Sequence, residues 1–369
     1  MQTVRNHAFR LKPRNYGLFL TALFILCVLN TCTGDLRRGP YLIDATPQGV
    51  TICWVSQRSN RGQVEVNSAT GGAPFIFSDI KPETLHRTVI KGLMPGTRYN
   101  YSISGEGPTE KGSFKTAPAA SQPFHFAVFG DTRSQKDRHA AIIRQLVLLD
   151  PDFVLQTGDL VENGSKEPLW SDFFSIEREL LRRSPYYPVP GNHEGEASNY
   201  FKYFPHSRNY SFDYGNAHFI GLDTNITSSQ FAAQEKWLRA DLAAHKNAVW
   251  RIVFCHHPLY SSSTGSSRIA EAARLSARLL PILKTGQVQL VLSGHDHNYQ
   301  RYESEGIQFI VTGGGGAPLY AMKVTSPLAR KTARVYHVCS IHVNGSALSI
   351  HVIQPDGTLV EDLQLKANQ

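Results

Sequence analysis

The sequence is poor in cysteine, with five in 369 residues and no Cys-x-x-Cys spacing. This argues against a zinc site built from thiolates. Beyond residue 32 the cysteines form an odd set, Cys53, Cys255 and Cys339, and each lies in an apolar run typical of a strand. Because free cysteine in such a setting behaves as a small hydrophobic residue, we expect all three to be buried in the core and to form no disulfide framework.

A strong excess of one charge is also absent. The formal net charge is +8, but Arg5, Arg10, Lys12 and Arg14 precede the first acidic residue and supply four of these charges, which leaves +4 for the rest of the chain. The sequence contains no basic run interleaved with aromatic residues. We therefore expect no nucleic-acid partner, and the mild positive charge suits an anionic substrate without identifying one.

The sequence also lacks an apolar run long enough for a comfortable membrane span. Residues 16–29 are mostly apolar and follow the four basic residues, which is typical of a secretory signal. Leu29-Asn30-Thr31-Cys32 then resembles the end of a bacterial lipoprotein signal. We predict a signal peptide at residues 1–32 and export of the protein. The alternatives are a periplasmic or cell-envelope lipoprotein, attached to the membrane through lipidated Cys32, and a soluble secreted protein.

Residues 36–117 are predicted to form an all-β domain. Short runs of alternating apolar and polar residues, such as 63–66 and 98–103, are separated by Gly and Pro, which is typical of a β-sandwich. The segment Leu93-Met94-Pro95-Gly96-Thr97-Arg98-Tyr99 resembles a pattern of fibronectin type III domains, in which the tyrosine packs across a corner of the sandwich. That resemblance gives the corner position to Tyr99. Residues 118–123 are the predicted linker.

The pattern changes at residue 124. Residues 124–129 and 153–156 are apolar runs typical of strands, and residues 137–149 between them carry apolar side chains at helical spacing. Strand, helix and strand in this order indicate an α/β domain, which we place at residues 124–366. Further strands are expected at 187–189, 218–222, 250–255, 289–292 and 309–311, and further helices at 169–181, 230–243 and 269–283.

Five polar clusters follow predicted strands, where open α/β sheets place their ligands. One such cluster alone would be an ordinary turn, since Gly, Asp and Asn favour turns for structural reasons. Five in one domain, rich in Asp, Asn and His and without thiolate pairs, favour binding of Fe, Mn or Zn, and two ions roughly 3.5–4 Å apart are one arrangement that such loops serve. The clusters are Gly130-Asp131-Thr132-Arg133, Gly158-Asp159, Gly191-Asn192-His193-Glu194, Cys255-His256-His257 and Gly294-His295-Asp296-His297.

In this order the clusters resemble the motifs of the calcineurin-like metallophosphoesterase superfamily. With a fibronectin-like domain ahead of them, the chain is similar to purple acid phosphatases. The resemblance implies a two-sheet sandwich flanked by helices and a site for two divalent or trivalent metal ions. It implies that Asp159 bridges the ions, that Asp131 and His297 bind the first, and that Asn192, His256 and His295 bind the second.

The resemblance also implies the chemistry. A hydroxide held by the two ions attacks a phosphate monoester in line, and the ions neutralise the phosphoryl oxygens. His193 faces the substrate in this comparison and donates a hydrogen bond to the phosphate or a proton to the leaving oxygen. We expect a phosphorylated small molecule as substrate. Two alternatives stay open, a phosphodiester substrate at the same site and a surface binding protein with a degenerate metal site.

Two positions depart from the family pattern. Most members carry a His two residues after the first Asp, where this chain has Arg133, and purple acid phosphatases carry a Tyr three residues after the bridging Asp, where this chain has Glu162. The first ion is then short of one ligand, for which Glu162, His139 and water are candidates, while a surface position on a helix is the other interpretation of His139. Arg133 either binds the phosphate as a bidentate donor, which we favour, or pairs with a carboxylate.

Overall fold

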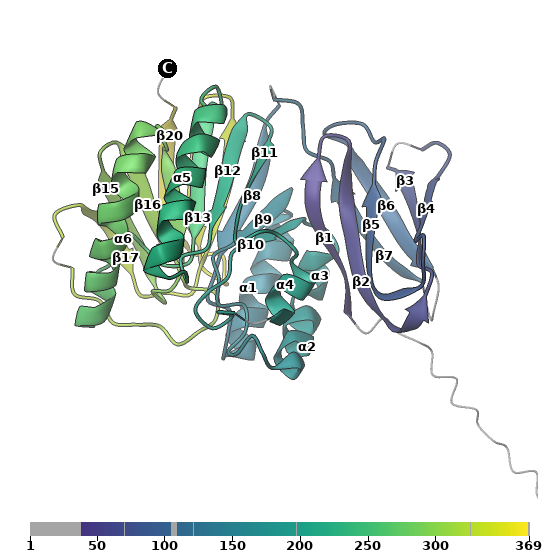
Figure 1. The fold of residues 1–369 in the computed structure, drawn as a ribbon, viewed down its shortest axis with the longest axis horizontal. Coiled ribbons are helices and arrows are strands. Elements are labelled where there is room, and N and C mark those ends of the chain that lie inside the picture. Colours follow the sequence, from purple (N-terminus) through teal and green to yellow (C-terminus); the bar gives the residue numbers. More distant parts are fainter. Residues whose placement is uncertain are drawn as a thin grey trace, which may run out of the picture. The chain divides into compact units, whose positions relative to one another are not determined.

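The computed structural model describes residues 38–367, apart from positions 70, 105–108, 121, 197 and 325 (Figure 1). The predicted signal peptide and Cys32 lie outside the described residues, so cleavage and lipidation stay predictions. Among the helices that the structure describes, none is long and apolar enough to cross a membrane.

The first seven strands form two antiparallel sheets. They are β1 (Arg38–Thr46), β2 (Gly49–Asn60), β3 (Gln63–Ser68), β4 (Phe75–Ser78), β5 (Glu83–Ile90), β6 (Arg98–Ser104) and β7 (Glu110–Lys115). The sheet orders are β1-β2-β5 and β4-β3-β6-β7. Along β5, His86, Thr88 and Ile90 are buried and the residues between them are exposed, so one face of the strand packs inward. Tyr99 is also buried, and its hydroxyl accepts a hydrogen bond from the backbone N–H of Met94 (3.0 Å), as expected at the sandwich corner.

The following strands form two mixed sheets. They are β8 (Phe124–Phe129), β9 (Phe153–Gln156), β10 (Tyr186–Pro188), β11 (Asn209–Tyr214), β12 (Ala217–Leu222), β13 (Trp250–Cys255), β14 (Leu290–Ser293), β15 (Tyr299–Ser304), β16 (Ile307–Thr312), β17 (Ala329–Ala333), β18 (Val338–Asn344), β19 (Ala347–Ile353) and β20 (Leu359–Lys366). The orders are β10-β9-β8-β18-β19-β20 and β11-β12-β13-β14-β16-β15-β17. Strands β8, β9 and β10 are parallel to one another, and so are β12, β13, β14 and β16.

The two mixed sheets pack face to face, with helices on their outer faces (Figure 1). Between the sheets, the rings of Phe126, Phe153 and Phe219 lie 5.1 to 5.3 Å from one another. Ile142 of the first helix and Leu279 of the last belong to separate apolar clusters on the outer sides. This arrangement confirms the predicted α/β domain with a two-sheet sandwich. The helices are α1 (Lys136–Leu149), α2 (Glu167–Ile176), α3 (Arg178–Leu181), α4 (Ser198–Tyr203), α5 (Ser228–Ala244) and α6 (Ser266–Thr285).

The predicted helix at 169–181 is interrupted in the structure. Helix α2 ends before Glu177, and α3 begins after it. The Glu177 side chain is fully buried and contacts Nε2 of His139 at 2.8 Å. The break therefore coincides with a tertiary contact, which the spacing of apolar residues cannot predict. Helix α4 was not predicted either, because its six residues are too few to establish a helical period.

The all-β part packs directly on the α/β part. Tyr41 and Cys53 share an apolar cluster with Ala127 and Phe129 of the first mixed sheet. The Tyr41 hydroxyl also donates a hydrogen bond to the carbonyl of Tyr203 (3.0 Å). The cysteines at 53, 255 and 339 are all free and buried, as predicted.

Candidate metal centre

Five strands carry the predicted site residues at their carboxyl ends. In a parallel sheet these ends meet at one edge, and the loops that follow them lie together. The two mixed sheets bring two such edges side by side, which places loops from distant parts of the sequence in contact. Asp131 follows β8, Asp159 follows β9, Asn192 follows β10, His256 follows β13, and His295 follows β14.

The backbone of these loops is unusual in two ways. Asp131, Asp159 and His295 have φ angles of 59°, 56° and 67°, in the left-handed region that residues other than glycine seldom adopt. Such conformations concentrate at functional sites, where the surrounding structure holds them. The loops also approach one another closely, because a Cβ on Gly191 would overlap the Asp159 carboxylate and one on Gly294 would lie 2.5 Å from Oδ2 of Asp131.

Asp131, Asp159 and His297 form the first group of candidate ligands. All three are buried, and one ligand atom of each lies within 4.8 Å of the other two. Nε2 of His297 is 3.4 Å from Oδ1 of Asp131. Nδ1 of His297 is 2.8 Å from the carbonyl of Pro318, which can only accept, so this nitrogen carries the proton. The lone pair of Nε2 is therefore directed at the carboxylates.

One oxygen of Asp131 accepts no hydrogen bond from the described residues. Oδ2 accepts a hydrogen bond from the backbone N–H of His295 (2.9 Å). Oδ1 is buried and has no hydrogen-bond donor anywhere in the described part of the chain. A buried carboxylate oxygen without a donor is costly unless a cation balances it. This oxygen therefore suits a metal ion.

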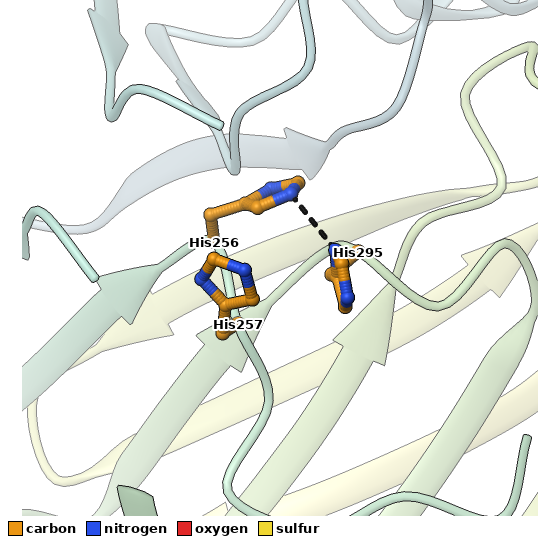
Figure 2. Close-up of side chains that lie close together, drawn as sticks. All are labelled: His256, His257 and His295. Atoms are coloured by element: carbon orange, nitrogen blue, oxygen red, sulfur yellow. Dashed lines mark hydrogen bonds between the residues drawn. The ribbon is translucent and has the colours of Figure 1, made fainter. Parts of the chain in front are cut away.

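His256 and His295 form the second group together with Asn192. Figure 2 shows the two rings close together and joined by a dashed line, which links Nε2 of His256 to Nδ1 of His295 (3.2 Å). Each of these nitrogens lies 3.0 Å from Oδ1 of Asn192. Nδ1 of His256 donates to the carbonyl of Thr157 (2.8 Å), which leaves the Nε2 lone pair free. Two imidazole nitrogens and an amide oxygen thus converge on one point.

His257 lies beside this second group, and its ring is 4.4 Å from that of His295 (Figure 2). Its Nδ1 contacts the hydroxyl of Thr224 at 2.8 Å, and its Nε2 is 3.7 Å from Oε1 of Glu271. The other carboxylate oxygen of Glu271 is 3.5 Å from Nε2 of His295, a contact that lowers the pKa of Glu271 to about 2. Glu271 was not predicted as a site residue, because in the sequence it is one charged position on a helix.

Asp159 lies between the two groups. Besides its place in the first group, its Oδ1 is 3.4 Å from Nε2 of His256 and accepts the backbone N–H of His193 (3.0 Å). Burial alone would raise the pKa of this carboxyl, but His256, His193 and Arg133 together hold it below its ordinary value. Asp159 is therefore an ionised carboxylate in contact with both groups of candidate ligands.

The two predicted catalytic side chains also contact Asp159. Nε of Arg133 is 3.2 Å from Oδ2 of Asp159, and its Nη1 is 2.7 Å from Oε2 of Glu162. His193 donates from Nδ1 to the carbonyl of Glu162 (2.6 Å), and its Nε2 lies 3.8 Å from Oδ2 of Asp159. In this structure Arg133 thus pairs with carboxylates, which was the second of its two predicted roles.

Neither residue suggested as a further ligand joins the first group. The carboxylate of Glu162 is half-exposed and is bound by Arg133 and Ser134. His139 is buried in α1 against Glu177, so the interpretation of His139 as a surface residue is wrong. The helix turns this histidine toward the protein interior, which its position in the sequence does not reveal.

Glu194 stabilises the loops that carry the candidate ligands by accepting hydrogen bonds from their backbone. It is buried, and its carboxylate accepts backbone N–H groups from Asp159 (2.9 Å), Val161 (3.1 Å) and Gly191 (2.8 Å). Burial, together with the nearby charge of Asp159, raises the pKa of Glu194 to about 8. The sequence placed Glu194 in a polar cluster but assigned it no role, because its partners are backbone groups that only the fold brings together.

Comparisons with known proteins found a matching family model, related sequences and a similar fold. Residues 124–299 match the family model described as calcineurin-like phosphoesterase. Purple acid phosphatase 21 of Arabidopsis thaliana is 30% identical over 239 residues, 59% of this chain and 53% of that protein, and purple acid phosphatase 18 is 31% identical over 285 residues, 68% and 62%. A purple acid phosphatase from yellow lupin (Lupinus luteus) seeds shares the fold, with a TM-score of 0.75 and 19% identity over 89% of this chain and 74% of that one.

Residues 124–299 are therefore a calcineurin-like phosphoesterase domain. The chain as a whole resembles purple acid phosphatases in sequence and fold, with an N-terminal β domain ahead of the matched region. It spans about half the length of the first curated relatives that it matches. The family implies metal ions, and the two groups of Asp, Asn and His side chains are the candidates to hold them.

Proposed function

We propose that the protein hydrolyses phosphate monoesters at a site for two metal ions. The observation that carries this proposal is the convergence of two groups of ligand atoms on a shared carboxylate, beside a buried carboxylate oxygen that has no donor among the described residues. In this proposal Asp159 would contribute to both ions, Asp131 and His297 would hold the first, and Asn192, His256 and His295 would hold the second.

The donor set suits such ions. Carboxylate, amide and imidazole ligands without thiolates are those of Fe, Mn and Zn. Asp131 and Asp159 supply two negative charges, whereas two divalent or trivalent ions carry at least four positive ones. Because Asn192 is neutral, the loaded site keeps a net positive charge with which it attracts a phosphate group.

When bound, the ions lower the pKa of a water that becomes the nucleophile, and they neutralise the charge on the phosphoryl oxygens. His193 holds its Nδ1 proton on the carbonyl of Glu162, so Nε2 is the atom that faces the site and, once protonated, donates to the phosphate or the leaving oxygen. Arg133 exchanges Glu162 for a phosphoryl oxygen. The Glu162 side chain is 48% exposed, so giving up this pair costs about 1 kcal/mol or less.

Hydrolysis of a phosphate monoester and a phosphate diester, measured side by side, tests the proposal. The full chain is supplied with Mn²⁺, Zn²⁺ or Fe and assayed with p-nitrophenyl phosphate and bis(p-nitrophenyl) phosphate. We expect a higher kcat/KM for the monoester, and a loss of about 100-fold in His193→Asn with unchanged metal content. Lys236→Met, an exposed position on α5, is the control.

Two results would replace the proposal. Preference for the diester would favour a phosphodiesterase at the same site. No hydrolysis with any of the metals would favour a binding protein. The ion pair between Arg133 and Asp159 supports that alternative, because it occupies one oxygen of the carboxylate that both ions would share.

We also propose that the protein is exported, which the basic and apolar segments before Cys32 support. Cell fractionation of the wild type and of Cys32→Ser tests this. Wild type in the membrane fraction and Cys32→Ser in the soluble exported fraction would support lipidation. Both proteins in the soluble exported fraction would support simple cleavage, and both in the cytoplasm would contradict export.

A further inference from the structure

A basic cavity lies at the opposite ends of the strands from the metal centre. It has a volume of about 510 Å³, and its lining includes residues that follow α5, residues between the end of α6 and β14, Arg251 of β13 and the turn between β15 and β16. A neighbouring hollow of about 270 Å³ shares Lys246, Arg251 and Gln287 with it. Because the proposed ligands follow the carboxyl ends of these strands, the cavity is separate from the metal centre.

The lining of the two hollows is strongly cationic. Arg239, Lys246, Arg251 and Lys284 carry positive charge, and Glu305 is the acidic residue among the described residues that line them. Glu305 is paired with Lys284 at 2.5 Å. The remaining three cations therefore face the hollows without a carboxylate in the lining to balance them, which favours an anion.

Arg251 is the lining residue whose contacts point most directly to a bound anion. It is the second residue of β13 and lines both hollows, and the residue is 7% exposed. Nη1 donates to the carbonyl of Lys246 (3.1 Å), but Nε is buried and has no acceptor in the described part of the chain. Burial without a compensating carboxylate lowers the pKa of this guanidinium.

The other buried arginine among the described residues, Arg38, has a carboxylate partner in Glu167 (2.5 Å). Two partly buried arginines have such partners as well. Arg301 binds Glu361 at 2.8 Å, and Arg268 binds Asp296 at 2.9 Å. A buried cation without such a partner is costly, and so is a buried N–H without an acceptor. An oxyanion in the cavity would relieve both costs at once.

We propose that this cavity is a binding site for a phosphate-type oxyanion, held by Arg251 with Lys246 at its edge. The guanidinium offers neighbouring N–H donors to two oxygens of one tetrahedral anion. The cavity is larger than one phosphate, and Val249 and Ile307 add apolar surface to its lining. It therefore accommodates free phosphate or a phosphate joined to a small organic group. This inference does not depend on the proposed hydrolysis.

Ligand-dependent thermal unfolding of the full chain tests the proposal. The protein is kept in a chelator, so that metal ions contribute no phosphate binding, and is titrated with inorganic phosphate or phenylphosphonate against chloride at equal ionic strength. A ligand that binds the folded state raises Tm in proportion to its affinity. We expect phosphate to stabilise the wild type, with an apparent Kd at least 10-fold weaker in Lys246→Met and in Arg251→Lys.

The variants make the outcomes distinct. Arg251→Lys keeps the buried charge but lacks the fork of donors, and Lys246→Met changes an exposed side chain that is expected to leave folding intact. Lys236→Met, exposed on α5 and outside the cavity lining, should bind as the wild type does. Tighter binding of phenylphosphonate would assign an organic phosphate, and equal binding would assign free phosphate. No stabilisation beyond chloride, or equal stabilisation in both cavity variants, would overturn the proposal.

Discussion

Replacement of Glu271 by Ala tests how helix α6 orients a candidate metal ligand. The Glu271 carboxylate is 3.5 Å from Nε2 of His295, on the far side of the ring from the nitrogen that faces Asn192. Loss of such a supporting group typically weakens metal binding about 10- to 100-fold, or roughly 1.4 to 2.7 kcal/mol. Because the contact is long and the Glu271 side chain is 40% exposed, we expect the lower end, about 10-fold.

The assay is competition for the metal between the full chain and a chromogenic chelator, with kcat measured at saturating metal. Alanine suits the helix, so α6 should be retained. We expect weaker metal binding in Glu271→Ala but a kcat near that of the wild type. Glu179→Ala, which removes an exposed partner of Arg182 on α3, is the control. An unchanged metal affinity in Glu271→Ala would refute the view that this carboxylate holds His295 in place.

Two further predictions concern backbone packing and pH. Gly191→Ala should abolish activity and cost about 2 kcal/mol of stability, because its Cβ would overlap the Asp159 carboxylate; wild-type kcat/KM and Tm in this variant would contradict it. Burial opposes protonation of His218, but hydrogen bonds to Asp213 (2.7 Å) and Asp241 (2.8 Å) raise its pKa above 6.5, while both carboxyl pKa values are lowered below 3.8. These contacts stabilise the folded state fully between about pH 4 and 6.5. The stabilisation is lost as the pH rises through the folded-state pKa of His218, because the imidazole loses its charge. It is also lost as the pH falls through the folded-state pKa values of the two carboxyls, because they become protonated. Chemical denaturation of the wild type and His218→Gln should therefore differ by about 1–2 kcal/mol near pH 5.5 and by less at pH 9, and a constant difference would exclude this explanation.

Much of the fold was predictable from periodicity and turn residues. Apolar runs ending in Gly-Asp or Gly-His located β8, β9 and β14, and the helical spacing of residues 137–149 predicted α1 within one residue of its first position. The convergence of the polar clusters was also predictable, because parallel strands bring their carboxyl ends to one edge. What could not be predicted was the break at Glu177, since the break accompanies the contact of this residue with His139 across the packed helices.

The residues that contact the candidate metal ligands could not be predicted from the sequence, for a similar reason. Glu271 contacts His295 only because α6 packs over β13 and β14, and a single acidic residue on an amphipathic helix is normally a solvated charge. The pairing of Arg133 with Asp159 and Glu162 depends on the distance between two loops, so the sequence left both of its roles open. Arg251 gave no signal either, because what distinguishes it is the absence of a carboxylate partner among the described residues.

Metal content is the most direct test of the central claim. Elemental analysis of the purified full chain, beside Asp159→Ala, should find two metal ions per chain in the wild type, with loss of metal and of monoester hydrolysis together in the variant. One ion or none in the wild type, with no hydrolysis after reconstitution with Mn²⁺, Zn²⁺ or Fe, would contradict a two-metal site.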